Sequence, residues 1–256
     1  MHNDLYKEIT KITEEGGEAA LATVISASGS TPREEGAKML VMPDGSIRGT
    51  IGGGSIELRV IKEAAEVIKK EKPKHLCYRL KEGEELGMIC GGDVDVFIEP
   101  IISTPTLFIL GGGHISFTLA KIGKLVGYKV VVVDDRPEFA TTQRFPEAER
   151  VIAIDYDKAF SQLNVGKSGY IVIVTHGHKG DAAALEGALS TQAKYIGMIG
   201  SKTKNESVFT RLKAKRITQQ QLDRVHAPVG LSIHAQTPEE IAISIMAQII
   251  QVRRSY

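Results

Sequence analysis

The spacing of apolar and polar residues in the first hundred residues predicts two helices and several short strands. Apolar residues recur at helical spacing over residues 3–15, which predicts an opening helix. A second helix is predicted over residues 55–70, directly after a run of glycines. Strands are predicted at residues 20–26, 38–42, 75–80 and 94–98. We interpret residues 1–102 as a mixed α+β domain.

From residue 106 onward, strand patterns and helix patterns follow one another in turn. Strands are predicted at residues 106–110, 129–134, 150–153, 170–174 and 194–199. Helices are predicted at residues 114–126 and 180–190, after Ser201, and from Pro238 to Val252. Parallel neighbours in a sheet need a crossover connection, and a helix is the usual one. The pattern therefore predicts a Rossmann-like domain with a parallel, doubly wound α/β sheet over residues 103–256.

Composition excludes several classes of protein. The 32 basic and 31 acidic residues nearly cancel, so no long-range field would attract nucleic acid or an anionic membrane. No apolar run approaches the ~20 residues of a membrane helix, and the polar start of the chain is unlike an export signal. Cys77 and Cys90 are too few for a disulfide framework and lack the paired spacing of a structural zinc site. We expect a soluble, cytoplasmic protein without nucleic-acid or membrane partners.

The clearest chemical signal is a glycine turn between two apolar strands. The first strand leads into Gly111, Gly112 and Gly113, a helix follows, and the second strand ends at Asp134. In the dinucleotide fingerprint, the first glycine permits a tight turn, the second lets the backbone approach a pyrophosphate, and the acid binds ribose hydroxyls. Gly111, Gly113 and Asp134 match these roles, and the small Ser116 occupies the third glycine position. The segment predicts binding of a nucleotide or a pterin phosphate.

The choice of nucleotide stays open at this stage. Asp134 favours a free 2′-hydroxyl, whereas Arg136 could accept a 2′-phosphate, so NAD, NADP and other nucleotides are all compatible. The alternative is a parallel α/β domain that keeps the turn for structural reasons and binds nothing.

Short motifs, several of them glycine-rich, occur in both halves of the chain. In the first half they are residues 27–33 (ASGSTPR), 36–39 (GAKM), 49–54 (GTIGGG), 87–92 (GMICGG) and 98–100 (IEP). In the second half they are residues 111–114 (GGGH), 135–139 (DRPEF), 175–176 (TH), 197–201 (GMIGS) and 237–240 (TPEE). Together these motifs resemble the XdhC/CoxI family of molybdenum-enzyme maturation factors over nearly the whole chain.

The resemblance implies a chaperone for the molybdenum cofactor (molybdopterin). Such a protein binds the cofactor as cargo between its domains, protects it during sulfuration, and passes it to xanthine dehydrogenase or a related molybdenum hydroxylase. A cysteine desulfurase is the implied second partner. Two motifs depart from the family pattern. The usual Thr-His-Asp-His reads Thr-His-Gly-His at residues 175–178, so a role of that acid is absent or shifted to Asp181. The usual Gly-Leu-Asp-Ile-Gly reads Gly-Leu-Ser-Ile-His at residues 230–234.

Two glycine-rich loops of the first half are candidates for binding this anionic cargo. Gly52, Gly53 and Gly54 lead into a helix, so their backbone N–H groups and the positive helix end could hold a phosphate. The alternative is a flexible turn whose helix is capped by Ser55. A second loop of small residues lies upstream and contributes Ser28, Ser30 and Arg33.

Cys90 is a candidate soft ligand to molybdenum. Its flanking glycines would let a bulky ligand approach the sulfur, and a thiolate suits a soft metal or sulfur transfer. The alternative is a buried, inert cysteine. Cys77 lies inside a strand pattern and is expected to be such a residue.

In the second half, the candidate residues follow strand ends. His176 follows a strand whose carboxyl end should face the ligand crevice of a doubly wound sheet. With His178 and Asp181 it could bind a metal or the cofactor, although a polar loop is the commoner outcome. Ser201 opens a later helix. The full predicted cofactor-binding set is Ser28, Ser30, Arg33, Gly52, Gly53, Gly54, Cys90, Gly111, Gly113, His114, Asp134, Arg136, His176 and Ser201.

Two other functions compete with the chaperone. The Rossmann fingerprint alone would suit an NAD(P)-dependent oxidoreductase, but the sequence offers no proton-donor set such as a Tyr-x-x-x-Lys helix. A nucleotide-sensing regulator without catalysis is the third hypothesis. The apolar segment 241–250 is expected to be buried against the sheet, with a homodimer seam as the alternative.

Overall fold

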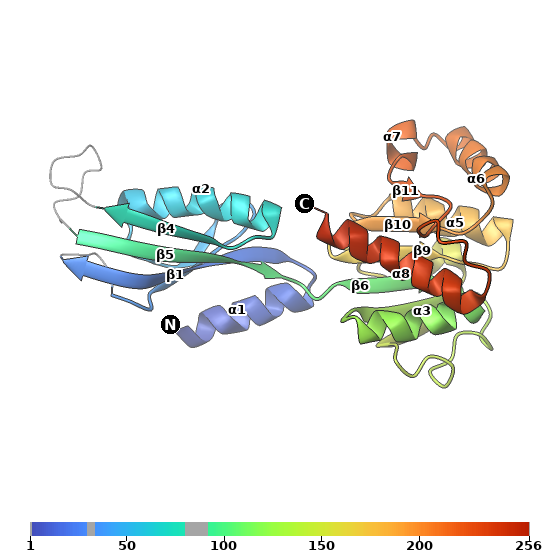
Figure 1. The fold of residues 1–256 in the computed structure, drawn as a ribbon, viewed down its shortest axis with the longest axis horizontal. Coiled ribbons are helices and arrows are strands. Elements are labelled where there is room, and N and C mark those ends of the chain that lie inside the picture. Colours follow the sequence, from blue (N-terminus) through green and yellow to red (C-terminus); the bar gives the residue numbers. More distant parts are fainter. Residues whose placement is uncertain (1, 30–33, 80–91, 256) are drawn as a thin grey trace. The chain divides into compact units, whose positions relative to one another are not determined.

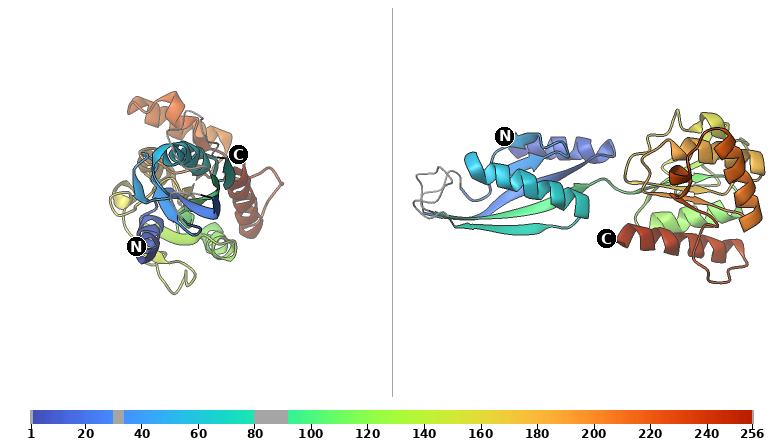
Figure 2. Two further views of the ribbon diagram at one scale, coloured as in Figure 1. Left: turned by 90° about the vertical axis from the view of Figure 1, so that its left-hand side faces the viewer. Right: turned by 90° about the horizontal axis from the view of Figure 1, so that it is seen from above.

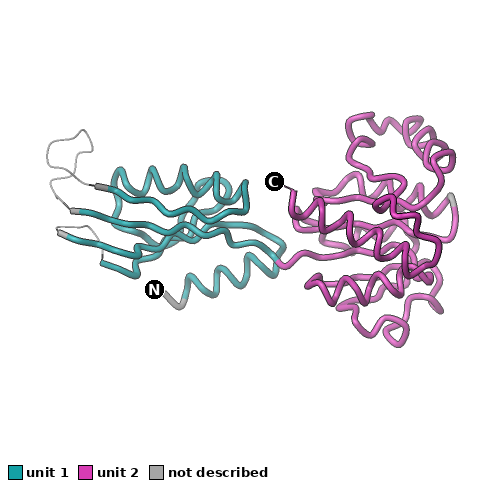
Figure 3. The backbone as a smooth tube through the Cα atoms, in the orientation of Figure 1, with its two compact units in different colours: residues 1–103 teal, residues 104–256 magenta. Residues whose placement is uncertain are grey.

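The structure is a computed structural model that describes residues 2–29, 34–79 and 92–255. The chain divides into two compact units, Met1–Ser103 and Thr104–Tyr256 (Figure 3). Each unit has its own sheet and its own hydrophobic core. No helix among the described residues combines the length and apolar content needed to cross a bilayer.

The first unit is an antiparallel five-stranded sheet with one helix on each face (Figures 1 and 2). Its strand order is β3-β2-β1-β5-β4. The strands are β1 (Glu18–Gly29), β2 (Lys38–Val41), β3 (Ile47–Gly49), β4 (Lys74–Arg79) and β5 (Gly92–Ile102). The helices are α1 (His2–Glu14) and α2 (Gly54–Lys70).

Alternation along β1 explains why two helices can pack on this sheet. Ala20 and Ala22 belong to the core shared with α2, whereas Ala19 and Leu21 share a core with Leu5 of α1. Successive side chains of a strand point to opposite faces, so one strand serves both cores. Strands β1 and β5 are longer than predicted, because they pair with each other from end to end.

The second unit has a parallel six-stranded sheet in the order β8-β7-β6-β9-β10-β11. The strands are β6 (Thr106–Leu110), β7 (Lys129–Asp134), β8 (Arg150–Ala153), β9 (Gly169–Ile173), β10 (Tyr195–Met198) and β11 (Val225–His226). Since the first strand of the unit, β6, lies beside the fourth, β9, the strand order reverses between them. This is the doubly wound Rossmann arrangement, and its ligands bind at the carboxyl ends of the strands next to such a switch point.

Helices cover both faces of this sheet (Figures 1 and 2). The helices are α3 (His114–Leu125), α4 (Tyr156–Ala159), α5 (His178–Leu189), α6 (Lys202–Ala214), α7 (Gln219–Leu222) and α8 (Pro238–Arg254). Helices α3 and α8 share one core with the sheet, and α4, α5 and α6 share the other. Helix α8 buries Ile245, Met246 and Ile249 in this way, whereas Ile243 on its other side is exposed.

The predicted fold class is confirmed, and the unpredicted elements are short. Hydrophobic periodicity does not predict β3, α4, α7 or β11, which have two to four residues each. A periodic pattern needs more residues than that to be recognised. Strand β11 exists because its backbone pairs with β10, which no local pattern records.

Candidate functional site

Gly111 lies where the strand order of the second unit reverses. Its φ of 119° is in the region that favours glycine, and a β-carbon at this position would overlap the carbonyl group of Val174. Val174 directly follows β9, and its amide donates to the carbonyl oxygen of Leu110 at the end of β6. The missing side chain therefore lets the ends of β6 and β9 lie against each other at the switch point.

Two helices that begin beside this switch point have glycine N-caps. Gly113 is the N-cap of α3 and Gly177 is the N-cap of α5. Glycine has no side chain, so neither cap accepts an N–H group from the first turn of its helix. By contrast, the side chains of Ser201 and Thr237 accept backbone N–H groups in the first turns of α6 and α8. The first N–H groups of a helix have no acceptor within the helix. The starts of α3 and α5 therefore leave these donors to solvent or to a ligand.

The space in front of both glycine caps is open. Among the described residues, and apart from its chain neighbours, a β-carbon built on Gly113 or on Gly177 would meet no atom within 4 Å. His114, a predicted site residue, is the first residue of α3 and is exposed, whereas Ser116 is fully buried in the same turn. Ser116 thus occupies the place where a small residue permits close packing of the helix on the sheet.

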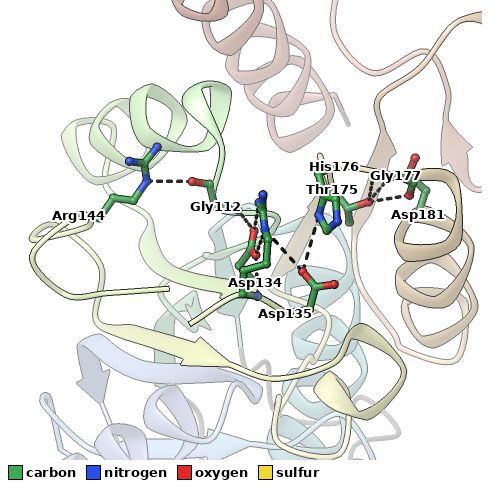
Figure 4. A network of polar contacts seen from close by, with 9 residues as sticks. Gly112, Asp134, Asp135, Arg144, Thr175, His176, Gly177 and Asp181 are labelled. Atoms are coloured by element: carbon green, nitrogen blue, oxygen red, sulfur yellow. Dashed lines mark hydrogen bonds and ion pairs between the residues drawn. The ribbon is translucent and has the colours of Figure 1, made fainter. Parts of the chain in front are cut away.

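Asp134 fastens the glycine turn to the end of β7 (Figure 4). Its Oδ2 accepts the amide of Gly112 at 2.6 Å, and its Oδ1 accepts the amide of Arg136 at 2.9 Å. The guanidinium of Arg136 adds two further bonds, at 2.9 Å to Oδ1 and 3.0 Å to Oδ2. The Asp134 side chain has no exposed surface.

These contacts set the charge of Asp134. Burial opposes ionisation, but the side-chain and backbone hydrogen bonds from Arg136 and the backbone bond from Gly112 outweigh it and lower the pKa of Asp134 to about 2. Both oxygens of this carboxylate are engaged, and the side chain is closed to solvent. The contact between Asp134 and a ribose stays a prediction, and in this conformation Arg136 stands in its way.

A second arginine, Arg144, reaches the same turn. Its Nε donates to the carbonyl oxygen of Gly112 at 2.9 Å (Figure 4). Arg144 and Arg136 both approach Phe139, with guanidinium carbons 5.3 Å and 3.8 Å from the ring centre. Two cationic groups therefore lie next to the glycine turn and are held by one aromatic ring. No sequence motif marks Arg144, because 32 residues separate it from Gly112.

The end of β9 carries a second polar network. Thr175 donates its hydroxyl to Asp181 at 2.7 Å, and Asp181 forms an ion pair with Lys204 of α6 at 2.5 Å. Asp181 is fully buried, so it links α5, α6 and the strand end. His176 is half exposed and turns instead to Asp135, with 3.7 Å between Nδ1 and Oδ1 (Figure 4). His176 and Asp181 thus belong to separate contacts. The side chain of His178 is outside the described residues.

Ser201 is exposed and caps α6 by accepting the amide of Lys204 at 3.2 Å. The preceding Gly200 has a φ of 145°, and its carbonyl oxygen accepts the side-chain amide of the buried Asn205. The hydroxyl of Ser201 therefore already occupies part of the donor set that a phosphate would use at this helix.

In the first unit, the glycine loop before α2 folds around a carboxylate of the chain itself. One oxygen of Glu57, Oε1, accepts the amides of Ile51 at 3.2 Å and Gly53 at 2.9 Å, and it also accepts the Thr50 hydroxyl. Burial opposes ionisation of Glu57, but these hydrogen bonds outweigh it and lower the pKa of this carboxyl. Phosphate binding by Gly52, Gly53 and Gly54 stays a prediction, and the anion at this loop is Glu57.

The remaining candidates of the first unit lie at or beyond strand ends. Ser28 is exposed near the end of β1, opposite Asp93 of β5. Ser30, Arg33 and Cys90 are outside the described residues.

The expectation that Cys77 is buried is wrong. Cys77 lies in β4 but is exposed. Its neighbours Leu76 and Tyr78 pack against the core under α2, so alternation turns Cys77 to the opposite face of the sheet.

Comparisons with known proteins agree with this architecture. Residues 107–249 match the XdhC Rossmann domain, and residues 12–79 match the XdhC and CoxI family. An uncharacterized protein of Escherichia coli, YqeB, is 32% identical over 98% of this chain and 47% of its own length. A protein of Bacillus subtilis named as a probable xanthine dehydrogenase subunit is 30% identical over 62% of this chain and 46% of its own length. The chain therefore spans about half the length of each of these two relatives.

Two further proteins are similar over almost the whole chain. The molybdenum cofactor insertion chaperone PaoD of Escherichia coli is 20% identical over 98% of this chain and 89% of its own length. A crystal structure described as a xanthine dehydrogenase from Bacillus halodurans has a TM-score of 0.53 and 25% identity, covering 97% of this chain and 95% of that one. With both of the family's domains matched in order, this chain belongs to the XdhC/CoxI family.

Proposed function

We propose that this chain is a maturation factor that binds the molybdenum cofactor as cargo, protects it during sulfuration and delivers it to a xanthine dehydrogenase-type hydroxylase. The family membership supports this role, because one relative is named a molybdenum cofactor insertion chaperone and another is named as part of a probable xanthine dehydrogenase. A cysteine desulfurase would supply the sulfur.

The observation that carries the proposal is the pair of glycine-capped helix starts at the switch point. The cofactor has an anionic phosphate, and helix N-termini bind such groups through exposed N–H donors and the positive end of the helix dipole. Gly113 and Gly177 both face open space, and neither cap has a side chain that could accept these donors. A phosphate seated there would contact the starts of α3 and α5, which follow the neighbouring strands β6 and β9.

The neighbouring side chains suit the rest of such a ligand. Arg136 and Arg144 add positive charge beside the glycine turn. Asp135 and His176 are partly exposed and offer an acceptor and a donor to the polar edge of a pterin. Each group is held by contacts within the second unit, so the binding surface is formed before the ligand arrives.

The NAD(P)-dependent oxidoreductase is the alternative, and the strand order together with the glycine turn favours it. The position of Asp134 argues against it. The residue that would hold the ribose is fully buried and bound by Arg136 and Gly112.

The test is retention of released molybdenum cofactor by the purified chain. We expect the chain to protect the cofactor from oxidation, and Gly113→Ala and Gly177→Ala to weaken its retention by about tenfold or more, because a methyl group would enter the space of the phosphate. Thr218→Ala is the matched control, because it removes a side-chain cap from a different helix and should leave retention unchanged. Full retention in both glycine variants would refute this site. Tight NAD(P)H binding without cofactor retention would favour the oxidoreductase.

A further inference from the structure

Three side chains with metal-binding atoms meet on one face of the sheet of the first unit, and none of them belongs to the predicted cofactor-binding set. His75 and Cys77 are two residues apart on β4, so they point to the same face. Asp95 of β5 lies directly opposite Cys77 in the antiparallel register. Because Leu76 and Val96 point into the core under α2, the three polar side chains occupy the other face.

The distances between these side chains fit a bound ion. His75 Nε2 lies 3.8 Å from Cys77 Sγ and 3.8 Å from Asp95 Oδ2, and one ligand atom from each residue lies within 4.8 Å of the others. Ligands held ~2.0–2.3 Å from a tetrahedral zinc ion lie about 3.3–3.8 Å from each other. The two separations from His75 are at the upper end of this range, and the third, between Cys77 and Asp95, is at most 4.8 Å.

A plain histidine–carboxylate contact explains this arrangement less well. A hydrogen bond between His75 and Asp95 would bring its two atoms to about 2.7–3.2 Å, which is shorter than the separation here. The other oxygen of Asp95, Oδ1, is buried and has no hydrogen-bond partner among the described residues. An ion between the three groups would compensate the charge of this carboxylate.

We propose that His75, Cys77 and Asp95 bind a divalent zinc ion on the face of the first sheet opposite α2. An imidazole, a thiolate and a carboxylate are the three side-chain ligands that zinc takes in proteins. With three protein ligands, the fourth position would belong to water or to a further ligand. The site is reachable from solution, because β4 is an edge strand and about half of the His75 side chain is exposed.

Cobalt and zinc titrations of the full chain, stripped of metal with a chelator, test this site. We expect about one tightly held ion per chain, and for cobalt a thiolate-to-metal charge-transfer band in the near ultraviolet. Cys77→Ser should abolish the band, and His75→Ala and Asp95→Asn should each weaken binding by at least about tenfold, since each removes one of three ligands. His75 and Cys77 are exposed, so their variants should keep the circular dichroism of the parent.

Two matched controls make the assignment specific. Cys90→Ser removes the other cysteine of the chain, and Asp93→Asn changes a neighbouring acid of the same strand and face. Both should bind cobalt as the parent does, with the same charge-transfer band. A parent chain that holds no zinc after dialysis, or a band that survives in Cys77→Ser and disappears in Cys90→Ser, would overturn the proposal.

Discussion

Arg136 and Asp134 form a bidentate pair in which the arginine Nε is 2.9 Å from Oδ1 and Nη2 is 3.0 Å from Oδ2. The same carboxylate accepts the amide of Gly112, so the pair joins the end of β7 to the turn before α3. Charge-assisted bidentate bonds are among the strongest hydrogen bonds in proteins. The acid of the dinucleotide fingerprint therefore fixes the shape of the glycine turn in this protein.

Replacing this acid should destabilise the second unit. We expect Asp134→Asn to lower the free energy of unfolding by about 2–4 kcal/mol at neutral pH, because Arg136 loses a buried partner and Gly112 loses a charged acceptor. Urea unfolding measures the change. Asp135→Asn is the control, because this neighbour is partly exposed, and it should cost less than about 1 kcal/mol.

The pair of Arg136 and Asp134 should also make the stability of the second unit depend on pH. The pKa of Asp134 falls from 3.8 to about 2 on folding, so its stabilising effect is complete above the unfolded pKa and disappears as the pH falls through about 2. The difference in unfolding free energy between the parent and Asp134→Asn should therefore shrink between about pH 4 and pH 2. A difference that stays constant over this range would contradict the assigned pair.

Two neighbouring glycines should respond differently to alanine. At Gly111 the backbone φ is 119° and a β-carbon would overlap Val174, so Gly111→Ala should lower the free energy of unfolding by about 2 kcal/mol or more and disturb the β6–β9 pairing. At Gly113 the φ is −74° and the space is open, so Gly113→Ala should cost less than about 1 kcal/mol.

Thermal unfolding and cofactor retention, measured on both variants, separate structure from binding. We expect Gly111→Ala to lose both stability and retention, and Gly113→Ala to lose retention alone. If Gly113→Ala retained the cofactor as the parent does, the start of α3 would not be the phosphate site.

Local spacing in the sequence identifies the glycine turn of the second unit, but not the contacts that its individual residues make. Gly111 and Asp134 stand out because local spacing around a strand–turn–helix segment marks them. Arg144 does not, because it reaches Gly112 through the fold. Glu57 does not stand out in the sequence either, because no spacing rule predicts that a carboxylate of a helix accepts amides from the glycine loop before it. Motif spacing thus identifies a candidate segment, whereas packing decides which of its polar groups already have partners.

The wrong expectation for Cys77 has a similar origin. A strand pattern predicts that half of its residues are buried, but not which face carries a second layer. Helix α1 packs on β1 near Ala19 and Leu21, and Cys77 belongs to an edge strand. Its closeness to Asp95 depends on the register between β4 and β5, which long-range pairing sets.

Glu57 should behave as a built-in anion of the loop before α2. Glu57→Ala removes the acceptor of the Ile51 and Gly53 amides, so we expect a loss of about 1–3 kcal/mol in the stability of the first unit. Sulfate or phosphate should then raise the melting temperature of Glu57→Ala more than that of the parent, because the ion can occupy the vacated donors.

Glu63→Ala is the matched control for this experiment. Glu63 lies on the same helix but pairs with Lys74 at the surface, so its removal should cost less than about 1 kcal/mol and create no response to sulfate. Equal sulfate responses in both variants would show that the effect is a general salt effect, and the loop would then not be an anion site.

Asp181 and Lys204 should be strongly coupled, because the carboxylate is fully buried and the ammonium group lies 2.5 Å from it. Asp181→Ala should lower the free energy of unfolding by about 3–5 kcal/mol, since it removes the charged partner of Lys204 and the shorter of the two hydrogen bonds of the Thr175 hydroxyl. Lys204→Met should lower the free energy of unfolding much less in the Asp181→Ala variant than in the parent protein. A double-mutant cycle measured by urea unfolding gives the coupling, which we expect to be about 1–3 kcal/mol. A coupling near zero would mean that α5 and α6 are held together by their apolar contacts alone.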